Sequence, residues 1–168
     1  MNELKNFRAE KDRFFATHPQ SPLTHEQRHN FNGLEYFPEN EDLRLEVEVE
    51  AFPDREQILM QTSTGDVQEF VRYGKFRFSV EGAEAELTVF ANQHGFFIPF
   101  VDSLTGVETY PAGRYLDPEP LDDGRFLIDF NLAYNPYCAY NELYSCPLPP
   151  AENRLKVPIR AGEKIFKD

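Results

Sequence analysis

Short segments of alternating apolar and polar residues, each bounded by turn residues, fill the middle of this chain. In the first, residues 43–52, leucine, valine and alanine alternate with arginine and glutamate, which is the pattern of a half-exposed strand. More candidate strands follow at residues 58–62, 67–73, 75–80, 83–92, 96–102, 108–116 and 126–131. Glycine, proline and aspartate separate them, as turns require. The pattern predicts a mainly β fold, an antiparallel β-barrel or sandwich.

The chain ahead of these strands is expected to be helical. Within residues 3–15, phenylalanine and leucine recur at helical spacing between charged residues, which predicts an amphipathic helix that packs across a sheet edge. Thr24 followed three residues later by Gln27 matches a capping box, the start signal of a second, short helix. Residues 1–32 are therefore the helical N-terminal segment of the predicted fold.

The length of the chain fits a single domain, residues 1–168, with an antiparallel β core over residues 43–131. Hydrophobic residues make up 40% of the chain and 16 positions are phenylalanine. We therefore expect a core that folds without a metal or disulfide staple.

The net charge of −12 bears on the partners of the protein. Nucleic acids and anionic membranes attract clustered lysine and arginine, so we expect neither as a partner. Eleven arginines against six lysines in an acidic chain agree with a high-salt cytoplasm, and an ordinary acidic surface explains them equally well. The charged N-terminus and the lack of any run of about 18 apolar residues predict a cytoplasmic protein with reduced thiols. A mature chain whose export signal had been removed would look the same.

Residues 129–163 form the most unusual tract of the chain. They hold both cysteines, four of the eight tyrosines, four asparagines and five prolines. Proline and asparagine interrupt regular ladders, and a buried tyrosine needs a partner for its hydroxyl. We interpret this 129–163 tract as an ordered polar-aromatic loop that packs against the sheet, either as a preorganised site or as a structural plug.

The tract also supplies most candidate ligand-binding residues. If it folds back over the sheet, its asparagines and Asp129 converge with arginines and tyrosine hydroxyls. An arginine there could pair with Asp129 and hold the loop, which we favour because buried polar groups must be satisfied, or present a fork to a ligand carboxylate or phosphate. The predicted ligand-binding residues are Arg114, Asp129, Asn131, Tyr134, Asn135, Tyr137, Cys138, Asn141 and Arg154.

The two cysteines allow several roles. A disulfide between Cys138 and Cys146 would close a nine-residue loop and stabilise the fold by roughly 2.6 kcal/mol. Their C-x7-C spacing is not a zinc knuckle and the histidines lie far away in sequence, so we predict no metal and no cofactor. Cys138 could be a nucleophile if a neighbour lowered its pKa, but a structural cysteine fits better. Glycine-rich phosphate-binding motifs and a G-x-S-x-G elbow are absent.

Several motifs in and before the tract carry a family resemblance. They are Ser21-Pro22-Leu23, residues 33–38 (GLEYFP), residues 133–141 (AYNPYCAYN), residues 146–150 (CPLPP) and Glu152-Asn153-Arg154. Through them most of the chain resembles the uncharacterised prokaryotic family known as domain of unknown function 1684. The resemblance implies no activity, substrate or catalytic residue.

Three functional hypotheses follow from the sequence. The first is a non-catalytic small-molecule-binding β domain, with a pocket bordered by the tract and by the apolar run 96–101, which is either plain core or cavity lining. The second is an enzyme, a hydrolase or thiol-dependent catalyst that uses Cys138 with Asp129 or Arg154. The third is a structural or interaction protein that docks a partner through its tyrosines.

Overall fold

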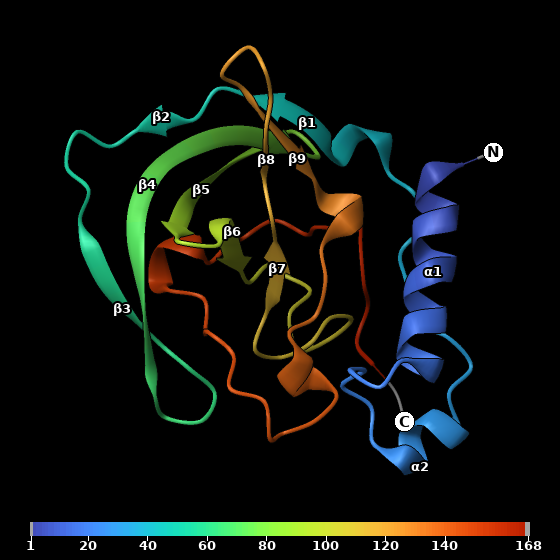
Figure 1. Ribbon diagram of the computed structural model, residues 1–168. Helices are drawn as coiled ribbons and strands as arrows, with labels where there is room; N and C mark the ends of the chain where they lie inside the picture. Colours follow the sequence, from blue (N-terminus) through green and yellow to red (C-terminus); the bar gives the residue numbers. More distant parts are fainter. Residues whose placement is uncertain (1, 167–168) are drawn as a thin grey trace.

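The computed structural model describes residues 2–166 of the chain. Within them two helices come first, α1 (Glu3–Thr17) and α2 (His25–His29), and nine strands follow. The strands are β1 (Arg44–Val47), β2 (Glu50–Ala51), β3 (Gln57–Gln61), β4 (Val67–Val80), β5 (Ala83–Asn92), β6 (Gly95–Phe100), β7 (Arg114–Leu116), β8 (Glu119–Pro120) and β9 (Phe126–Asp129). Figure 1 shows β4 curving around the shorter strands, with α1 on the other side of the molecule. The fold is mainly β and antiparallel with an N-terminal helical segment, as predicted.

The strands form two antiparallel sheets. One has the order β1-β9-β8, and the other runs β2-β4-β5-β6-β7 with β3 also paired to β4. In neither sheet do the first and last of the described strands pair with each other, so both strand orders are open. Residues 43–52, predicted as one strand, divide into β1 and β2, which belong to different sheets. Of the predicted strand 108–116 only β7 is extended, because residues 107–109 donate their backbone N–H groups to the Leu104 carbonyl oxygen in a turn.

β4 is continuous where the sequence indicated two strands, 67–73 and 75–80. A β-bulge between Arg72 and Gly74 absorbs the irregularity and lets the pairing with β5 continue. A Cβ at Gly74 would lie 2.6 Å from the Glu50 carbonyl oxygen, so only glycine allows β2 to approach β4 this closely.

Both sheets bury apolar side chains in one core. Phe126 and Ile128 of β9 belong to the same buried cluster as Phe78 of β4 and Phe100 of β6. The ring of Phe130, directly after β9, lies 5.3 Å from that of Phe78 and 5.7 Å from that of Phe100. Burial of each such side chain contributes roughly 1.5–3 kcal/mol. This shared core therefore holds the two sheets together.

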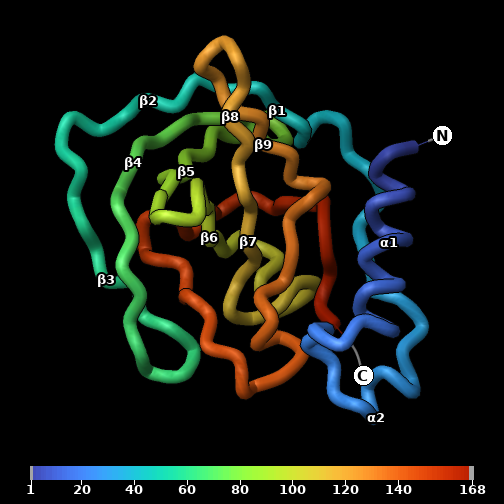
Figure 2. The backbone as a smooth tube through the Cα atoms, in the orientation of Figure 1, coloured from blue at the N-terminus to red at the C-terminus, as the bar shows by residue number. Residues whose placement is uncertain are grey.

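The helices pack against the 129–163 tract, whereas the sequence suggested a sheet edge. Phe15 of α1 is buried, with its ring 5.0 Å from that of Tyr140 and 6.2 Å from that of Tyr137. The predicted capping box is present at α2, since the side chains of Thr24 and Gln27 each accept the backbone N–H of the other, at 3.2 and 2.8 Å. Figure 2 shows the red C-terminal segment running beside α1, so both ends of the described chain lie on this side.

The tract itself is ordered without long regular elements. It contains three 3-10 turns, Phe130–Leu132, Tyr137–Ala139 and Ala151–Asn153. Single β-bridges join it to the rest of the fold, pairing Tyr134 with Tyr115, Pro147 with Thr62, and Arg154 with Val101. At its end the chain turns at Gly162, where φ is +81° and a Cβ would lie 2.7 Å from the Ala133 carbonyl oxygen. Glycine thus lets the returning chain pass directly beside the start of the tract.

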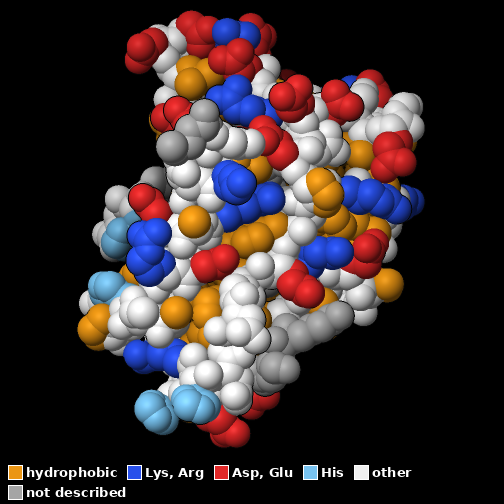
Figure 3. Space-filling model, turned by 90° about the vertical axis from the view of Figure 1, so that its right-hand side faces the viewer, with side chains coloured by type: hydrophobic (Ala, Val, Ile, Leu, Met, Phe, Trp, Pro, Cys, Tyr) orange, Lys and Arg blue, Asp and Glu red, His pale blue; other side chains and the backbone are white. Residues whose placement is uncertain are grey.

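The surface on the side of α1 carries both signs of charge. Figure 3 shows Lys and Arg side chains on this face interspersed with Asp and Glu and with apolar patches. Neither described helix combines the length and the apolar run that a crossing of the bilayer requires.

Candidate functional site

A cleft of about 890 Å³ lies where the large sheet, the connection from β7 to β8 and the 129–163 tract meet. We call it the aromatic cleft, because three phenylalanines and four tyrosines line it. These are Phe70, Phe96, Phe97, Tyr115, Tyr134, Tyr137 and Tyr144. The volume lies within the usual range for small-molecule sites.

The strands form one wall of the aromatic cleft. Phe96 and Phe97, at the start of β6, are half-buried and line it, whereas Ile98 and Phe100 further along the strand are buried in the core. The Phe97 ring stacks on that of Phe70 at 5.4 Å. The apolar run predicted at residues 96–101 therefore serves as cavity lining at one end and as core at the other.

The tract forms the opposite wall. Tyr134 and Tyr115 exchange two backbone hydrogen bonds of 2.8 and 3.0 Å, and their rings meet edge to face at 5.7 Å. The Tyr115 hydroxyl donates to the Pro147 carbonyl oxygen. Tyr137 and Tyr144 also meet edge to face, at 5.2 Å. These contacts hold the rings in place without a ligand, so the wall is preorganised.

Carboxylates give the aromatic cleft its charge. Asp117 and Glu119 line it, and no lysine or arginine of the described chain does. The Tyr134 hydroxyl lies 3.1 and 3.0 Å from the two Asp117 carboxylate oxygens. Although Asp117 stays exposed, the surrounding protein displaces water and raises the pKa of its carboxyl, while the bond from Tyr134 opposes this. Burial is the main cause that raises the pKa of the Tyr134 hydroxyl, and the negative charge of Asp117 raises it further. The hydroxyl therefore keeps its proton and donates a hydrogen bond to the carboxylate.

The two cysteines lie together at this wall as buried free thiols, and Cys146 lines the cleft while Cys138 lies behind it. The Cys138 N–H donates to Cys146 Sγ at 3.3 Å, and the Tyr110 hydroxyl lies 3.6 Å from Cys138 Sγ. The hydrogen bond between the two thiols lowers the pKa of Cys138 and raises that of Cys146, so the pair ionises at Cys138 first. Neither Asp129 nor Arg154, the partners in the enzyme hypothesis, hydrogen bonds to Cys138 within the described chain. Among residues 2–166 no group of three or more His, Cys, Asp or Glu side chains is arranged to hold a metal ion.

Arg114 is bound by the protein's own backbone. Its side chain is 1% exposed, and its guanidinium donates to the carbonyl oxygens of Ala161 at 2.6 Å, Ile159 at 2.9 Å and Glu163 at 3.1 Å. A fourth bond, of 3.1 Å, goes to Asp102 Oδ2. Burial lowers the pKa of Arg114, and the charge of Asp102 opposes this. Arg114 thus holds the returning chain in place, and its guanidinium is not directed to a ligand.

Asp129 and Asn131 close the end of β9. Asp129 Oδ1 accepts the Asn131 N–H at 3.0 Å and its side-chain N–H at 2.9 Å. Asn131 in turn binds the backbone of Asn40 through both ends of its amide, at 2.8 and 2.9 Å. Asp129 Oδ2 lies 3.6 Å from Arg44 Nε, so its cationic partner is on β1 and is not one of the arginines expected from the sequence.

Asn135 belongs to a cluster around the buried carboxylate of Glu163. Glu163 accepts from the Asn135 N–H at 3.0 Å, from the Tyr140 hydroxyl at 2.9 Å and from the Lys11 ammonium. The Asn135 side chain donates to the Lys164 carbonyl oxygen at 3.0 Å. Because Lys11 lies on α1, this Glu163 cluster ties the helix to the tract.

The structure therefore does not bring the nine predicted residues into one site. Tyr134 and Tyr137 line the aromatic cleft, and Cys138 lies behind its wall. Asn141 caps a local turn through the Leu143 N–H at 3.0 Å, and Arg154 is exposed. The other four hold the fold as described above.

Asp117 and Glu119 of the cleft were not among the residues predicted from the sequence. Both lie outside the tract, in a segment where carboxylates alternate with Pro118 and Pro120. Proline in a strand pattern indicates an edge strand or an irregular connection. The two prolines were therefore the one local sign that this acidic segment would be accessible. Nothing local indicated that the tract would lie opposite it.

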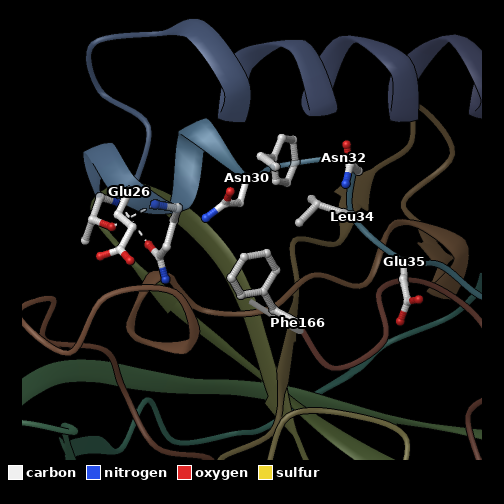
Figure 4. A pocket seen from close by; sticks show the side chains of 10 residues that line it. Glu26, Asn30, Asn32, Leu34, Glu35 and Phe166 are labelled. Atoms are coloured by element: carbon white, nitrogen blue, oxygen red, sulfur yellow. Dashed lines mark hydrogen bonds between the residues drawn. The ribbon is translucent and has the colours of Figure 1, made fainter.

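A second cavity, of about 860 Å³, lies beside α2. Figure 4 shows the ring of Phe166 in its middle, with Asn30 and Leu34 on one side and Glu35 on another. Much of its wall is polar, and Gln27 is engaged there in the capping box and with the Tyr140 carbonyl oxygen at 2.9 Å. None of the predicted site residues lines this cavity. The aromatic cleft is accordingly the candidate site.

Comparison with known proteins agrees with the motifs in the tract. The model of the family described as "Protein of unknown function (DUF1684)" matches residues 29–164. The chain belongs to this family. It is similar to an uncharacterised protein of Haloarcula marismortui solved by NMR in solution, with 39% sequence identity and a TM-score of 0.72, over 96% of this chain and 92% of that one. No curated protein matches the chain. No function is established through the family or this relative, so the function has to be argued from the site.

Proposed function

We propose that the protein is a non-catalytic β domain that binds a small molecule in the aromatic cleft. One observation carries the proposal: a cleft of about 890 Å³ is walled by aromatic rings that other protein groups already hold in place. Preformed concavities with mainly apolar walls and few polar groups are typical ligand sites. Rings that are already ordered lose little entropy on binding. In this proposal the two sheets form a sandwich around their shared core, and the tract borders the cleft.

The exposure of the rings supports binding over a purely structural role. Tyr144 is 36% exposed, and Phe96 and Phe97 are only half-buried, although Ile98 and Phe100 further along β6 are fully buried. Covering apolar surface contributes about 25 cal/mol per Å². A ligand that lies against these rings gains this free energy.

A variant that fills the cleft tests the proposal. Gln68 is exposed on β4 and lines the cleft, so Gln68→Trp introduces an indole there without removing a core side chain. Val67→Trp is the matched control, because Val67 is 53% exposed and successive residues of a strand point to opposite faces. The wild type and both variants are compared in a thermal-shift screen of metabolites. A ligand at one hundred times its Kd stabilises the fold by about 2.7 kcal/mol, which raises the Tm of a chain of this size by roughly 5–10 °C.

We expect at least one class of small molecule to raise the Tm of the wild type and of Val67→Trp, and to have no such effect on Gln68→Trp. A screen in which no compound shifts the wild-type Tm contradicts the proposal. Shifts that persist unchanged in Gln68→Trp contradict it as well, because they locate binding elsewhere.

Thiol-dependent chemistry is a second candidate, favoured by the lowered pKa of Cys138. The Cys138 side chain is buried, however, and only its neighbour Cys146 lines the cleft. Alkylation of the native protein by iodoacetamide at pH 7 decides the matter. If Cys138 reacts no faster than a free model thiol, the nucleophile of this candidate is lost.

A further inference from the structure

The charged groups that line the aromatic cleft favour a ligand with positive charge. Asp117 and Glu119 supply negative charge, His94 also lines the cleft, and no lysine or arginine of the described chain does. The net charge of −12 adds to the attraction for a cation and opposes the entry of an anion. The only hydrogen-bond partner of the Asp117 carboxylate within residues 2–166 is the neutral hydroxyl of Tyr134. The cleft therefore holds a carboxylate that forms no ion pair with a lysine or arginine of the described chain.

The rings supply a second attraction for a cation. A positive group within about 6 Å of the centre of an aromatic ring is drawn to the negative face of that ring. Phe97 meets Tyr115 at an interplanar angle of 76°, and Tyr137 meets Tyr144 at 81°. Because neighbouring rings are nearly perpendicular, the walls present faces in different directions and do not form one flat stack.

The ring of Tyr134, which also lines the cleft, already has an ammonium beside it. The Lys11 Nζ lies 5.2 Å from the ring centre of Tyr134. Lys11 forms its ion pair with Glu163, and its charge also acts on Asp117, where it opposes the rise in the pKa of that carboxyl. Lys11 does not line the cleft, so this contact is an example within the protein of an ammonium at cation-π distance from one ring of the wall.

We propose that the aromatic cleft binds an organic cation, an ammonium group carried on an apolar body. The proposal rests on the binding function above and names its ligand class. The cationic head lies by Asp117, and the apolar body covers the half-buried ring of Phe97 and the exposed ring of Tyr144.

Three probes that share a benzyl group test the preference for charge. They are benzyltrimethylammonium, benzyl alcohol and phenylacetate, which are cationic, neutral and anionic. Their affinities for the full chain are measured by NMR titration at low and at physiological salt. We expect the cation to bind about tenfold more tightly than the neutral probe, and the anion to bind least. The preference should weaken as salt screens the exposed carboxylate.

Two substitutions separate the charge from the rings. Asp117→Asn removes the charge and keeps the shape, and we expect it to weaken cation binding about fivefold to tenfold. Its matched control is Asp122→Asn, the same change in an exposed turn that does not line the cleft. Tyr144→Leu removes one aromatic ring and should also weaken the binding of the cation. Leu143→Ala changes the exposed neighbouring residue, which does not line the cleft, and should leave the affinity unchanged.

The outcomes distinguish this proposal from the one on which it rests. Equal affinity for all three probes, or a preference for phenylacetate, overturns the cation proposal and leaves ligand binding in place. If Asp117→Asn and Asp122→Asn weaken the binding of the cation equally, Asp117 is not the residue that attracts it, and that assignment is overturned. No binding of any probe, in a protein whose Tm no metabolite raises, overturns both proposals.

Discussion

Replacing Arg114 by methionine tests how the returning chain is held. The buried guanidinium donates to three carbonyl oxygens, of Ala161, Ile159 and Glu163, and to the carboxylate of Asp102. Methionine keeps an apolar stem but leaves these oxygens without their donor and leaves the Asp102 charge buried without a cation. Removing one partner of a buried ion pair costs about 3–5 kcal/mol. We therefore expect the free energy of unfolding to fall by about 4 kcal/mol, which lowers the Tm by roughly 8–16 °C.

Urea unfolding followed by circular dichroism measures this loss. Arg77→Met is the matched control, because Arg77 pairs with Glu86 at 3.0 Å while their side chains are 71% and 43% exposed. Such surface pairs contribute about 0–1 kcal/mol. A double-mutant cycle with Asp102→Asn isolates the energy of the buried pair, which we expect to be about 1–3 kcal/mol. If Arg114→Met loses no more stability than Arg77→Met, the interpretation of Arg114 as a clamp is refuted.

Two further predictions concern the Glu163 cluster and the thiols. Glu163→Gln removes the charge that pairs with Lys11, so we expect a loss of about 2–3 kcal/mol of unfolding free energy and faster hydrogen exchange in α1. Unchanged exchange in α1 would show that the cluster does not anchor the helix. The bond from Cys146 lowers the pKa of Cys138, so the pH midpoint of Cys138 alkylation should lie below the value of about 8.5 for a free thiol. Cys146→Ala should raise that midpoint, and a wild-type midpoint at or above the free-thiol value speaks against the pairing.

Local patterns predicted several elements of this fold well. The alternation of residues 83–92 corresponds to β5 with the same bounds, and the capping box at Thr24 starts α2. The membership of the family, expected from the motifs of the tract, is confirmed by the match over residues 29–164. These successes share a cause, since each signal depends on residues that are close together in the sequence.

Contacts between distant residues were predicted less well. Arg114 and Asp129 were predicted to lie in one site, but Arg114 pairs with Asp102, and Asp129 pairs with Arg44. The second pairing follows from the register of β1 on β9, which sets Arg44 opposite Asp129. Strand order and register depend on how whole segments pair, and composition does not specify which carboxylate an arginine meets.

The sequence by itself determined the mainly β class, the helical N-terminal segment and the position of the ordered tract. Periodicity and the backbone limits of proline, glycine and asparagine act over a few residues, so they can be read locally. Only the tertiary structure decided that rings from β6, from β7 and from the tract surround one cleft with Asp117 in its wall. A cleft exists because distant segments pack against one another and leave a space between them. Its shape and charge therefore depend on packing contacts that no single segment encodes.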